Sequence, residues 1–306
     1  MLKLFFKITT LSLASSLFII GFFLLSRDND NPQHSFLKGR FLKQERLSNI
    51  ETPRVILCGG SNLAFGIDTK LIQTKTGLEI VNMGLSRSLG LPYMLKELKG
   101  KVKANDIVIF ALEFDYYYKK QLLGFTPLFM IENNLNNLEY FNNKDDLTRI
   151  INFTPRYLQI KINQFLSKSN NNANPIYHEN AFNEYGDVIS HLEFDKTPKN
   201  INYNVFNLDH NTTNIALINN FVEEHPEAKI FTVFPSFLES NFKIHQKEVE
   251  ALYQLIKIES KTKFIGKSDS FVFPDNYFFD SVYHLNKKGR KLRSERLAIL
   301  INSKCK

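Results

Sequence analysis

Residues 54–61 read RVILCGGS, an apolar run that stops at two glycines and is followed by Ser61. A short apolar run bounded by glycines is typical of a buried strand. Further strands are predicted at 78–82, 106–112, 229–234 and 263–265, and helical segments separate them. Strands that alternate with helices predict a parallel sheet with right-handed crossovers. Ser61 is therefore expected at the carboxyl edge of the first strand, where the sites of open α/β sheets assemble.

Helices are expected at 68–76, 92–98, 156–167, 213–224 and 243–259, with a last helix after Asn286. Asn286 is predicted to cap that last helix, because an asparagine side chain can accept the first free backbone N–H groups. Its apolar positions Leu292, Ile299 and Leu300 are expected to face the sheet, with Leu297 nearer the edge of the stripe. This helix would fix the loop that precedes it.

That loop, at 279–286, reads FDSVYHLN and places Asp280 and His284 four residues apart. A serine hydroxyl is a poor nucleophile until an imidazole accepts its proton, and an acid orients that imidazole. We therefore expect Ser61 as nucleophile, His284 as base and Asp280 as orienting acid. Taken singly, a serine after two glycines is more often a turn residue, and a histidine before a helix is more often a capping or packing residue.

This constellation resembles the SGNH/GDSL hydrolase family. The family's first motif supplies the nucleophile and matches Gly60 and Ser61, and its last motif, an Asp followed shortly by His, matches Asp280 and His284. The second motif supplies a glycine N–H for the oxyanion, a role that falls on Gly84 in the segment VNMGLS, together with the N–H of Ser61. The resemblance implies a three-layer α/β/α, flavodoxin-like parallel sheet and a serine esterase or acyltransferase without a cofactor.

More narrowly, the last motif looks like that of membrane-anchored SGNH-like proteins of bacterial surface-polysaccharide acylation. This narrower resemblance implies an acylated carbohydrate or another ester as substrate, acetyl being the expected acyl group. It also implies a membrane acyltransferase as a partner.

Two departures from the family pattern concern the oxyanion and the acid. The third motif, Gly-x-Asn-Asp, should follow the third strand, but Glu113 stands there, and an ionised carboxylate cannot donate a hydrogen bond. Either Glu113 is protonated, or another group such as Asn62 substitutes, or activity is low or absent. Three residues separate Asp280 from His284 where the family usually has two, and Asp275 is the weaker alternative for the orienting acid.

The N-terminus is expected to be a membrane anchor at residues 1–27. The run Ile8–Ser26 carries no charge, and 19 helical residues span about 28 Å, enough to cross a bilayer core. Lys3 and Lys7 favour a cytoplasmic N-terminus, so the rest of this single-pass membrane protein would be extracytoplasmic. The alternative is a signal peptide cleaved near Ala14, which would leave an apolar new terminus.

Three further regions complete the expected organisation. Residues 28–52 are polar and are predicted to form a stalk, and residues 53–306 are predicted to form the SGNH-like domain. Within it, residues 116–210 are irregular, and we interpret them as an insertion over the strand ends that could be a lid or substrate-binding segment, or only a connector.

Composition and charge limit the classes of partner that the protein could bind. The net charge of +8 could favour anionic partners, or it could reflect lysines spread over solvated faces. Nucleic acid is disfavoured by the expected anchor and by the lack of a binding motif. The seven histidines show no ligand spacing, and two cysteines make neither a disulfide framework nor a metal site, so no metal is implied.

The sequence therefore predicts an ester hydrolase or O-acyltransferase that acts on an extracytoplasmic acylated carbohydrate through Ser61, His284 and Asp280. Gly84, Asn62 and Glu113 are the expected oxyanion and substrate-binding residues. The alternative is a noncatalytic binding or assembly subunit of a surface-polysaccharide modification system, which the missing third motif favours. Nucleotide binding is a poor third reading, because the glycines lack both the Gly-x-Gly-x-x-Gly pattern and a phosphate-loop lysine.

Overall fold

The computed structural model describes residues 3, 6–7, 9–15, 21, 32–118, 126–141, 144–166, 174–194, 198, 203, 205–207, 209–210 and 212–305. The chain divides into two compact units. The first unit consists of Met1–His34 and Gly124–Asn174, and the second, which we call the sheet unit, consists of Ser35–Leu123 and Pro175–Lys306. All six predicted site residues belong to the sheet unit.

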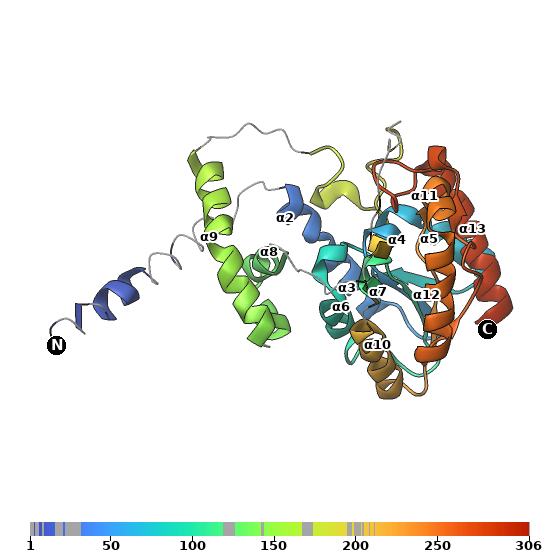
Figure 1. The fold of residues 1–306 in the computed structure, drawn as a ribbon, viewed down its shortest axis with the longest axis horizontal. Coiled ribbons are helices and arrows are strands. Elements are labelled where there is room, and N and C mark those ends of the chain that lie inside the picture. Colours follow the sequence, from blue (N-terminus) through green and yellow to red (C-terminus); the bar gives the residue numbers. More distant parts are fainter. Residues whose placement is uncertain are drawn as a thin grey trace. The chain divides into compact units, whose positions relative to one another are not determined.

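The sheet unit contains a five-stranded sheet in which every neighbouring pair is parallel, with the order β2-β1-β3-β4-β6. The predicted parallel α/β fold is thus confirmed, with helices flanking the sheet (Figure 1). The strands are β1 Arg54–Gly59, β2 Glu79–Asn82, β3 Ile107–Ala111, β4 Lys229–Thr232 and β6 Lys263–Phe264. A separate pair joins β5 (Phe237–Leu238) to β7 (Val272–Phe273).

Strands β1 and β3 are apolar apart from Arg54 because both faces of the sheet are covered. Every residue of β1 and β3 is buried, which explains their continuous apolar sequences. In the register of this pair, Gly59 at the end of β1 lies opposite Ala111 at the end of β3. The two strands therefore end side by side.

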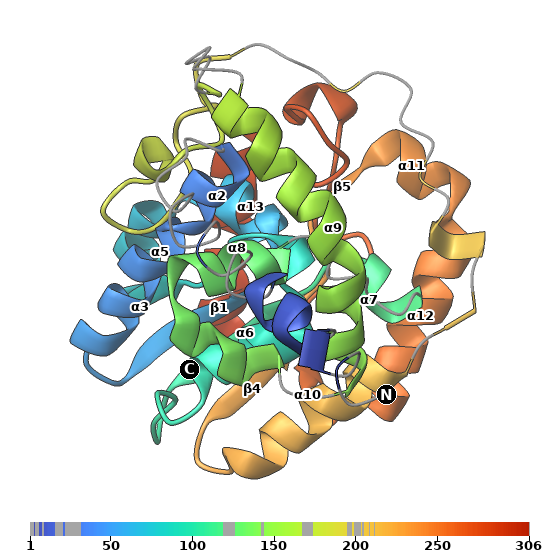
Figure 2. The same cartoon turned by 90° about the vertical axis from the view of Figure 1, so that its left-hand side faces the viewer.

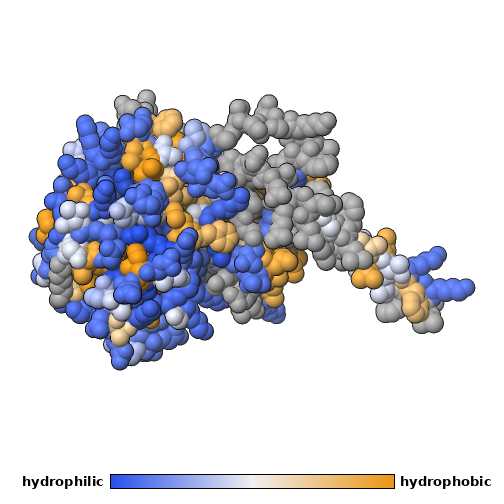
Figure 3. Space-filling view, turned by 180° about the vertical axis from the view of Figure 1, so that it is seen from behind, coloured by the Kyte–Doolittle hydropathy of each residue, from blue (hydrophilic) through white to orange (hydrophobic). Residues whose placement is uncertain are grey.

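The helices of the sheet unit follow the strands closely in sequence. Helices α5 and α13 pack against each other, and so do α6 and α10. The α-helices are α3 Gly39–Asn49, α4 Ser61–Gly66, α5 Thr69–Thr76, α6 Leu91–Leu98, α7 Asp115–Tyr118, α10 Thr213–Glu224, α11 Glu239–Ile244, α12 Gln246–Glu259 and α13 Lys287–Lys304, and α2 Pro32–Leu37 spans the boundary of the units. Short 3-10 helices lie at Arg87–Leu89, Glu179–Ala181, Val205–Asn207 and Asp275–Tyr277. The face of this unit drawn in Figure 3 is mostly hydrophilic.

The strand order creates a reversal point at β1. The chain passes from β1 to β2 on one side and later reaches β3 on the other side of β1. Ligands of open α/β sheets bind outside the carboxyl ends of the strands at such a point. Ser61 follows β1 and Glu113 follows β3, so both lie at this position.

The first unit contains two packed helices within the predicted insertion. Helices α8 (Thr126–Asn133) and α9 (Lys144–Leu166) lie together, as Figure 2 shows, and the 3-10 helix Leu135–Phe141 connects them. A buried ion pair joins Glu132 to Lys161. Helix α9 begins at Lys144, well before the predicted start at 156. Pro155 lies inside the helix and does not mark its beginning.

The segment predicted as a stalk is not wholly a stalk. Helix α3 belongs to the sheet unit, and Lys43 on it is buried, with Nζ donating to the backbone oxygens of Asn82 and Gly186. These two hydrogen bonds satisfy the Lys43 side chain, which a polar stalk would have left in water. Most of the predicted anchor, Ile8–Ser26, lies outside the described residues. In the part of the chain that is described, no helix is both long and apolar enough to cross a membrane.

Helix α13 begins as predicted but buries a different face. Asn286 caps it by accepting the N–H groups of Lys288 and Gly289, which confirms the predicted cap. The predicted apolar face is wrong: Ile299 is 66% exposed, whereas two arginines on the helix are buried. The buried positions are Gly289, Arg290, Arg293, Ser294, Leu297, Ala298 and Ile301, and the arginines replace apolar residues because they bind oxygens of the facing loops.

Candidate active site

The turn that carries Ser61 requires glycine for a packing reason. Ser61 is the first residue of α4, and Gly60 caps that helix. A Cβ atom on Gly60 would lie 2.5 Å from one carboxylate oxygen of Glu113 and 2.6 Å from the other. Any larger residue would push the turn away from β3, so the glycine of the first motif is explained by the close approach of Glu113.

Asn62 is fixed beneath the turn by hydrogen bonds at its backbone and its side chain. Its N–H donates to Glu113 Oε1 (3.1 Å), and Nδ2 donates to the Ala111 carbonyl (2.8 Å). Arg293 from α13 donates to the Asn62 carbonyl (2.6 Å) and to Oδ1 (2.8 Å). Asn62 is buried, so these bonds assign its side chain to the support of the turn rather than to the predicted oxyanion role.

Glu113 and Arg293 are buried charges of opposite sign. Burial lowers the pKa of Arg293 to about 9, and the negative charge of Glu113 opposes that shift. Glu113 Oε1 accepts the Asn62 N–H, while no described residue hydrogen-bonds Oε2. Glu113 Oε1 therefore acts as an acceptor for the turn in this structure.

Gly84 lies near the Ser61 helix, as the second motif requires, but its N–H is already bonded. It donates to Asn82 Oδ1 at 3.0 Å. A Cβ atom on Gly84 would clash with the Cβ of Leu63, so glycine is needed for the close approach to α4. The predicted oxyanion donor is thus placed beside the turn but held by an internal acceptor.

His284 and Asp280 form a close pair. Nδ1 of His284 lies 2.7 Å from Asp280 Oδ1, and Tyr177 donates its hydroxyl to Asp280 Oδ2 at 2.6 Å. Asp275 instead accepts the N–H of Ser240, so Asp280 is the partner of His284 despite the extra residue between them. With Nδ1 bound to the acid, Nε2 is the nitrogen that can act as a base.

The histidine is held against the helix that begins with Ser61. Its ring stacks on Phe65, with centroids 4.2 Å apart and planes 10° apart. Phe65 follows Ser61 by four residues, and residues four apart lie on one face of a helix. His284 therefore packs on a residue of the same short helix that Ser61 begins. Among the described residues, no hydrogen bond joins Ser61 to His284, and such contacts are often long before substrate binds.

The loop of His284 is anchored by bonds at its neighbours. His191 Nε2 lies 2.9 Å from the Leu285 carbonyl, and the His284 N–H donates to Ser281 Oγ at 3.1 Å. Burial lowers the pKa of His191 to about 4, so this imidazole is neutral and donates. The anchoring keeps the ring of His284 in one place.

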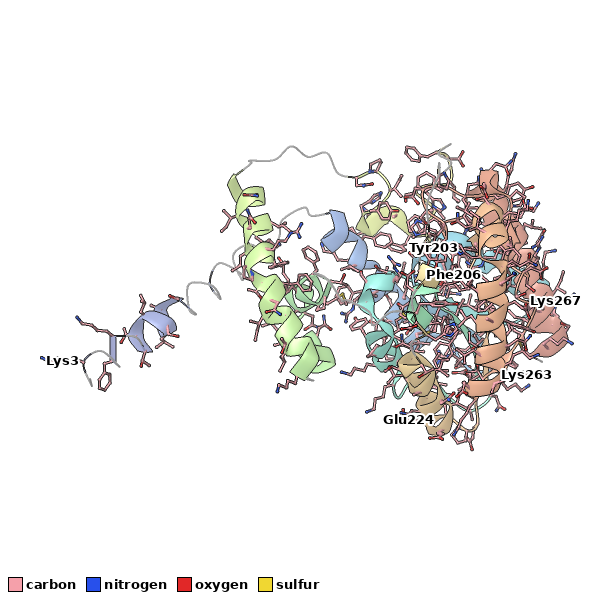
Figure 4. All side chains as sticks on the ribbon, in the orientation of Figure 1. Lys3, Tyr203, Phe206, Glu224, Lys263 and Lys267 are labelled. Carbon is pink, nitrogen blue, oxygen red and sulfur yellow. The ribbon has the colours of Figure 1, made fainter. Side chains whose placement is uncertain are left out.

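Tyrosine side chains bond the residues that follow β3. Tyr283 accepts the Phe114 N–H at 3.1 Å and also bonds the hydroxyl of Tyr203. Asp115 accepts from Tyr203 and pairs with Arg87 at 2.6 Å. Figure 4 labels Tyr203 beside Phe206, whose ring centroid lies 5.7 Å away. The segment after β3 is thus bonded to tyrosines that come from distant parts of the chain.

No protein-family model matches the chain, and no curated protein matches it. What the fold supports is a parallel α/β protein. Within the described ranges, no group of three or more His, Cys, Asp or Glu side chains could hold a metal ion.

Sequence reasoning missed three residues that shape this site. Tyr177 lies in the irregular region, more than one hundred residues from Asp280. His191 and Arg293 also act across long sequence separations. The one available sign was Arg293 itself, an arginine at a helix position that the helical period aligns with buried Leu297.

Proposed function

We propose that this chain is an SGNH-type serine ester hydrolase or O-acyltransferase that acts on an extracytoplasmic acylated carbohydrate. The observation that carries the proposal is the Asp280–His284 pair, which stacks on the helix headed by Ser61 at the reversal point of the sheet. A nucleophile, a base and an orienting acid are the parts that hydroxyl activation needs. The chain order Ser, Asp, His is also that of the SGNH pattern.

In the proposed reaction, Ser61 Oγ attacks the ester carbonyl while His284 Nε2 takes its proton. Asp280 accepts the Nδ1–H, holds the tautomer and stabilises the imidazolium. His284 then returns the proton to the leaving alkoxide, and an acyl group remains on Ser61. Water completes hydrolysis, or a sugar hydroxyl completes transfer, with His284 again as the base.

The oxyanion of this reaction would be bound by backbone N–H groups. The N–H of Ser61 is the first donor of the proposal. For Gly84 to be the second donor, its N–H must exchange Asn82 Oδ1 for the substrate oxygen. Each such donor contributes about 10²–10³ in rate, so this exchange would govern activity.

The location and substrate class rest on the sequence. The uncharged run Ile8–Ser26 supports a single-pass membrane protein with an extracytoplasmic sheet unit. The last motif supports a carbohydrate ester as substrate, with acetyl as the acyl group and a membrane acyltransferase as the partner that supplies or receives it.

The test is capture of the acyl-enzyme. The protein is mixed with an aryl acetate, quenched in acid, and analysed by intact-mass and peptide mass spectrometry. We expect one added acetyl group on the peptide that contains Ser61, and none in Ser61→Ala. Ser86→Ala is the matched control, because Ser86 also lies near the strand ends but only caps a 3-10 turn. An acetyl group that stays in Ser61→Ala would contradict the proposal.

A second candidate is a noncatalytic binding subunit. The observation that favours it is that the N–H groups of Gly84 and Asn62 are both bonded internally. Such a protein would form no acyl adduct, and Ser61→Ala would bind an acetylated polysaccharide as tightly as the wild type in isothermal titration calorimetry.

A further inference from the structure

Among the described residues, both Tyr177 and His284 hydrogen-bond Asp280. Tyr177 Oη donates to Asp280 Oδ2 at 2.6 Å, while His284 Nδ1 lies 2.7 Å from Oδ1. Tyr177 Oη is also 3.5 Å from Nδ1, so the three groups form one compact cluster. Both carboxylate oxygens are thus engaged, which fixes the plane of the carboxylate relative to the imidazole.

The ring of Tyr177 is held by the same aromatic side chain that holds the histidine. Phe65 lies 5.4 Å from Tyr177 and stacks on His284 at 4.2 Å, measured between centroids. Phe36 of α2 packs on the other rings, 5.6 Å from Tyr177 and 6.1 Å from Phe65. Tyr177 therefore has little freedom to leave Asp280.

The hydroxyl of Tyr177 is a donor in this cluster. Burial raises the pKa of Tyr177 well above its ordinary value, and the charge of Asp280 raises it further. A phenol that stays protonated can donate to a carboxylate, and a donor to a carboxylate stabilises its charged form and withdraws part of its charge from other partners.

We propose that Tyr177 is a positioning residue that orients Asp280 and sets the basicity of His284. This inference rests on the proposed function only where His284 is taken as the base that activates Ser61. Tyr177 comes from the segment that enters the sheet unit at Pro175. The proposed site is therefore assembled from three parts of the chain: the strand-end turn, the 279–286 loop and this segment.

Among the described residues, the titratable or charged groups near His284 bear on this inference. Asp280 and Tyr177 contact it directly. His191, which contacts Phe65, and Arg290 lie further away; His191 is neutral, and Arg290 is paired with Asp187. Removal of the Tyr177 hydroxyl takes one donor from Asp280 and leaves the side chains of Asp280, His191 and Arg290 in place, so a change in His284 can be assigned to that hydroxyl.

The test is an NMR titration of His284 in the wild type and in Tyr177→Phe, which keeps the ring and its packing. Without the tyrosine donor, Asp280 places more negative charge on the imidazolium, so the pKa of His284 should rise by about half to one unit. Tyr185→Phe is the control, since Tyr185 lies in the same segment but packs on Arg46. An unchanged His284 in Tyr177→Phe, or an equal rise in Tyr185→Phe, would overturn the inference.

A double substitution separates positioning from packing. In an Asp280→Asn background, Tyr177→Phe should leave the His284 titration unmoved, because the carboxylate through which Tyr177 acts is gone. An equal shift in both backgrounds would show that Tyr177 acts only through packing.

The same variants distinguish this inference from the proposed reaction. If both hold, the acid limb of the pH profile for Ser61 acylation moves upward in Tyr177→Phe by the shift that NMR measures. A shift of His284 in a protein that forms no acyl adduct would support the positioning role and reject the esterase.

Discussion

The two sides of the candidate site differ in what their polar groups are free to do. On the base side, Asp280 and His284 are paired at 2.7 Å, and His284 Nε2 remains as the nitrogen that can accept a proton. On the serine side, the N–H groups of Asn62 and Gly84 are bonded to Glu113 and Asn82. The base side matches the arrangement that the proposed reaction needs, whereas the N–H groups of the serine side are bonded within the protein.

Because of this difference, activity depends mainly on whether the serine side can bind the oxyanion. A histidine paired with an acid can activate a serine hydroxyl once substrate binding brings the hydroxyl within hydrogen-bonding distance of the imidazole. Oxyanion stabilisation needs donors aimed at the developing charge, and here the Gly84 N–H must leave Asn82 before it can donate to the substrate oxygen. Variants on each side should therefore fail in different ways.

The largest effect is expected from Asp280→Asn on the base side. Loss of the carboxylate disturbs the tautomer of His284, and the corresponding change in serine proteases lowers turnover by about 10⁴. Stopped-flow acylation with an aryl acetate would measure it. Asp275→Asn, which alters only an acceptor for the Ser240 N–H, should keep a rate near that of the wild type. Equal losses in the two variants would mean that Asp280 has no special role.

On the serine side, Arg293→Met should affect stability most. Arg293 holds Asn62, and its removal leaves the buried charge of Glu113 without its counter-charge. Leaving a buried charge without compensation costs about 3–5 kcal/mol of unfolding free energy, measurable by urea denaturation. The pair Arg293→Met with Glu113→Gln should recover part of this loss. Arg296→Met, at a partly buried position of the same helix, should lower the unfolding free energy by about 1 kcal/mol or less.

A smaller, pH-dependent effect is expected from His191, which anchors the base side through Leu285. The unfolded chain binds a proton at His191 below about pH 6.5, but the folded chain does so only below about pH 4. Stability is therefore lost as the pH falls through this window, by about 3 kcal/mol in total. Urea denaturation at several pH values should show that His191→Gln removes this part of the loss. An unchanged pH dependence in the variant would contradict the account.

The strands and the sheet were predictable because their patterns are local. Apolar runs and glycines located β1 and the Ser61 turn, and Asn286 marked the start of α13. The exposed Ile299 shows the limit of this reasoning. Helical period identifies a face, but the buried oxygens of Asn62 and Ile67 select arginines for that face, and sequence alone does not reveal them.

The site was predictable only in part for the same reason. Asp280 and His284 are neighbours in sequence, so their pairing could be expected. Tyr177 and His191 reach the same loop from the irregular region, and no periodic pattern indicates such contacts. The bonds that occupy Gly84 and Asn62 depend on atomic spacing at the strand ends, which a motif does not specify.

The central claim is that His284 activates Ser61, and labelling by a fluorophosphonate probe tests it most directly. The full chain is purified in detergent as wild type, Ser61→Ala and His284→Ala, and each form is treated with the probe. Circular dichroism confirms that each form is folded. The account predicts labelling of the wild type on Ser61 and its loss in both variants. A well-folded wild type that stays unlabelled, or a His284→Ala variant that labels as fast as the wild type, would contradict it.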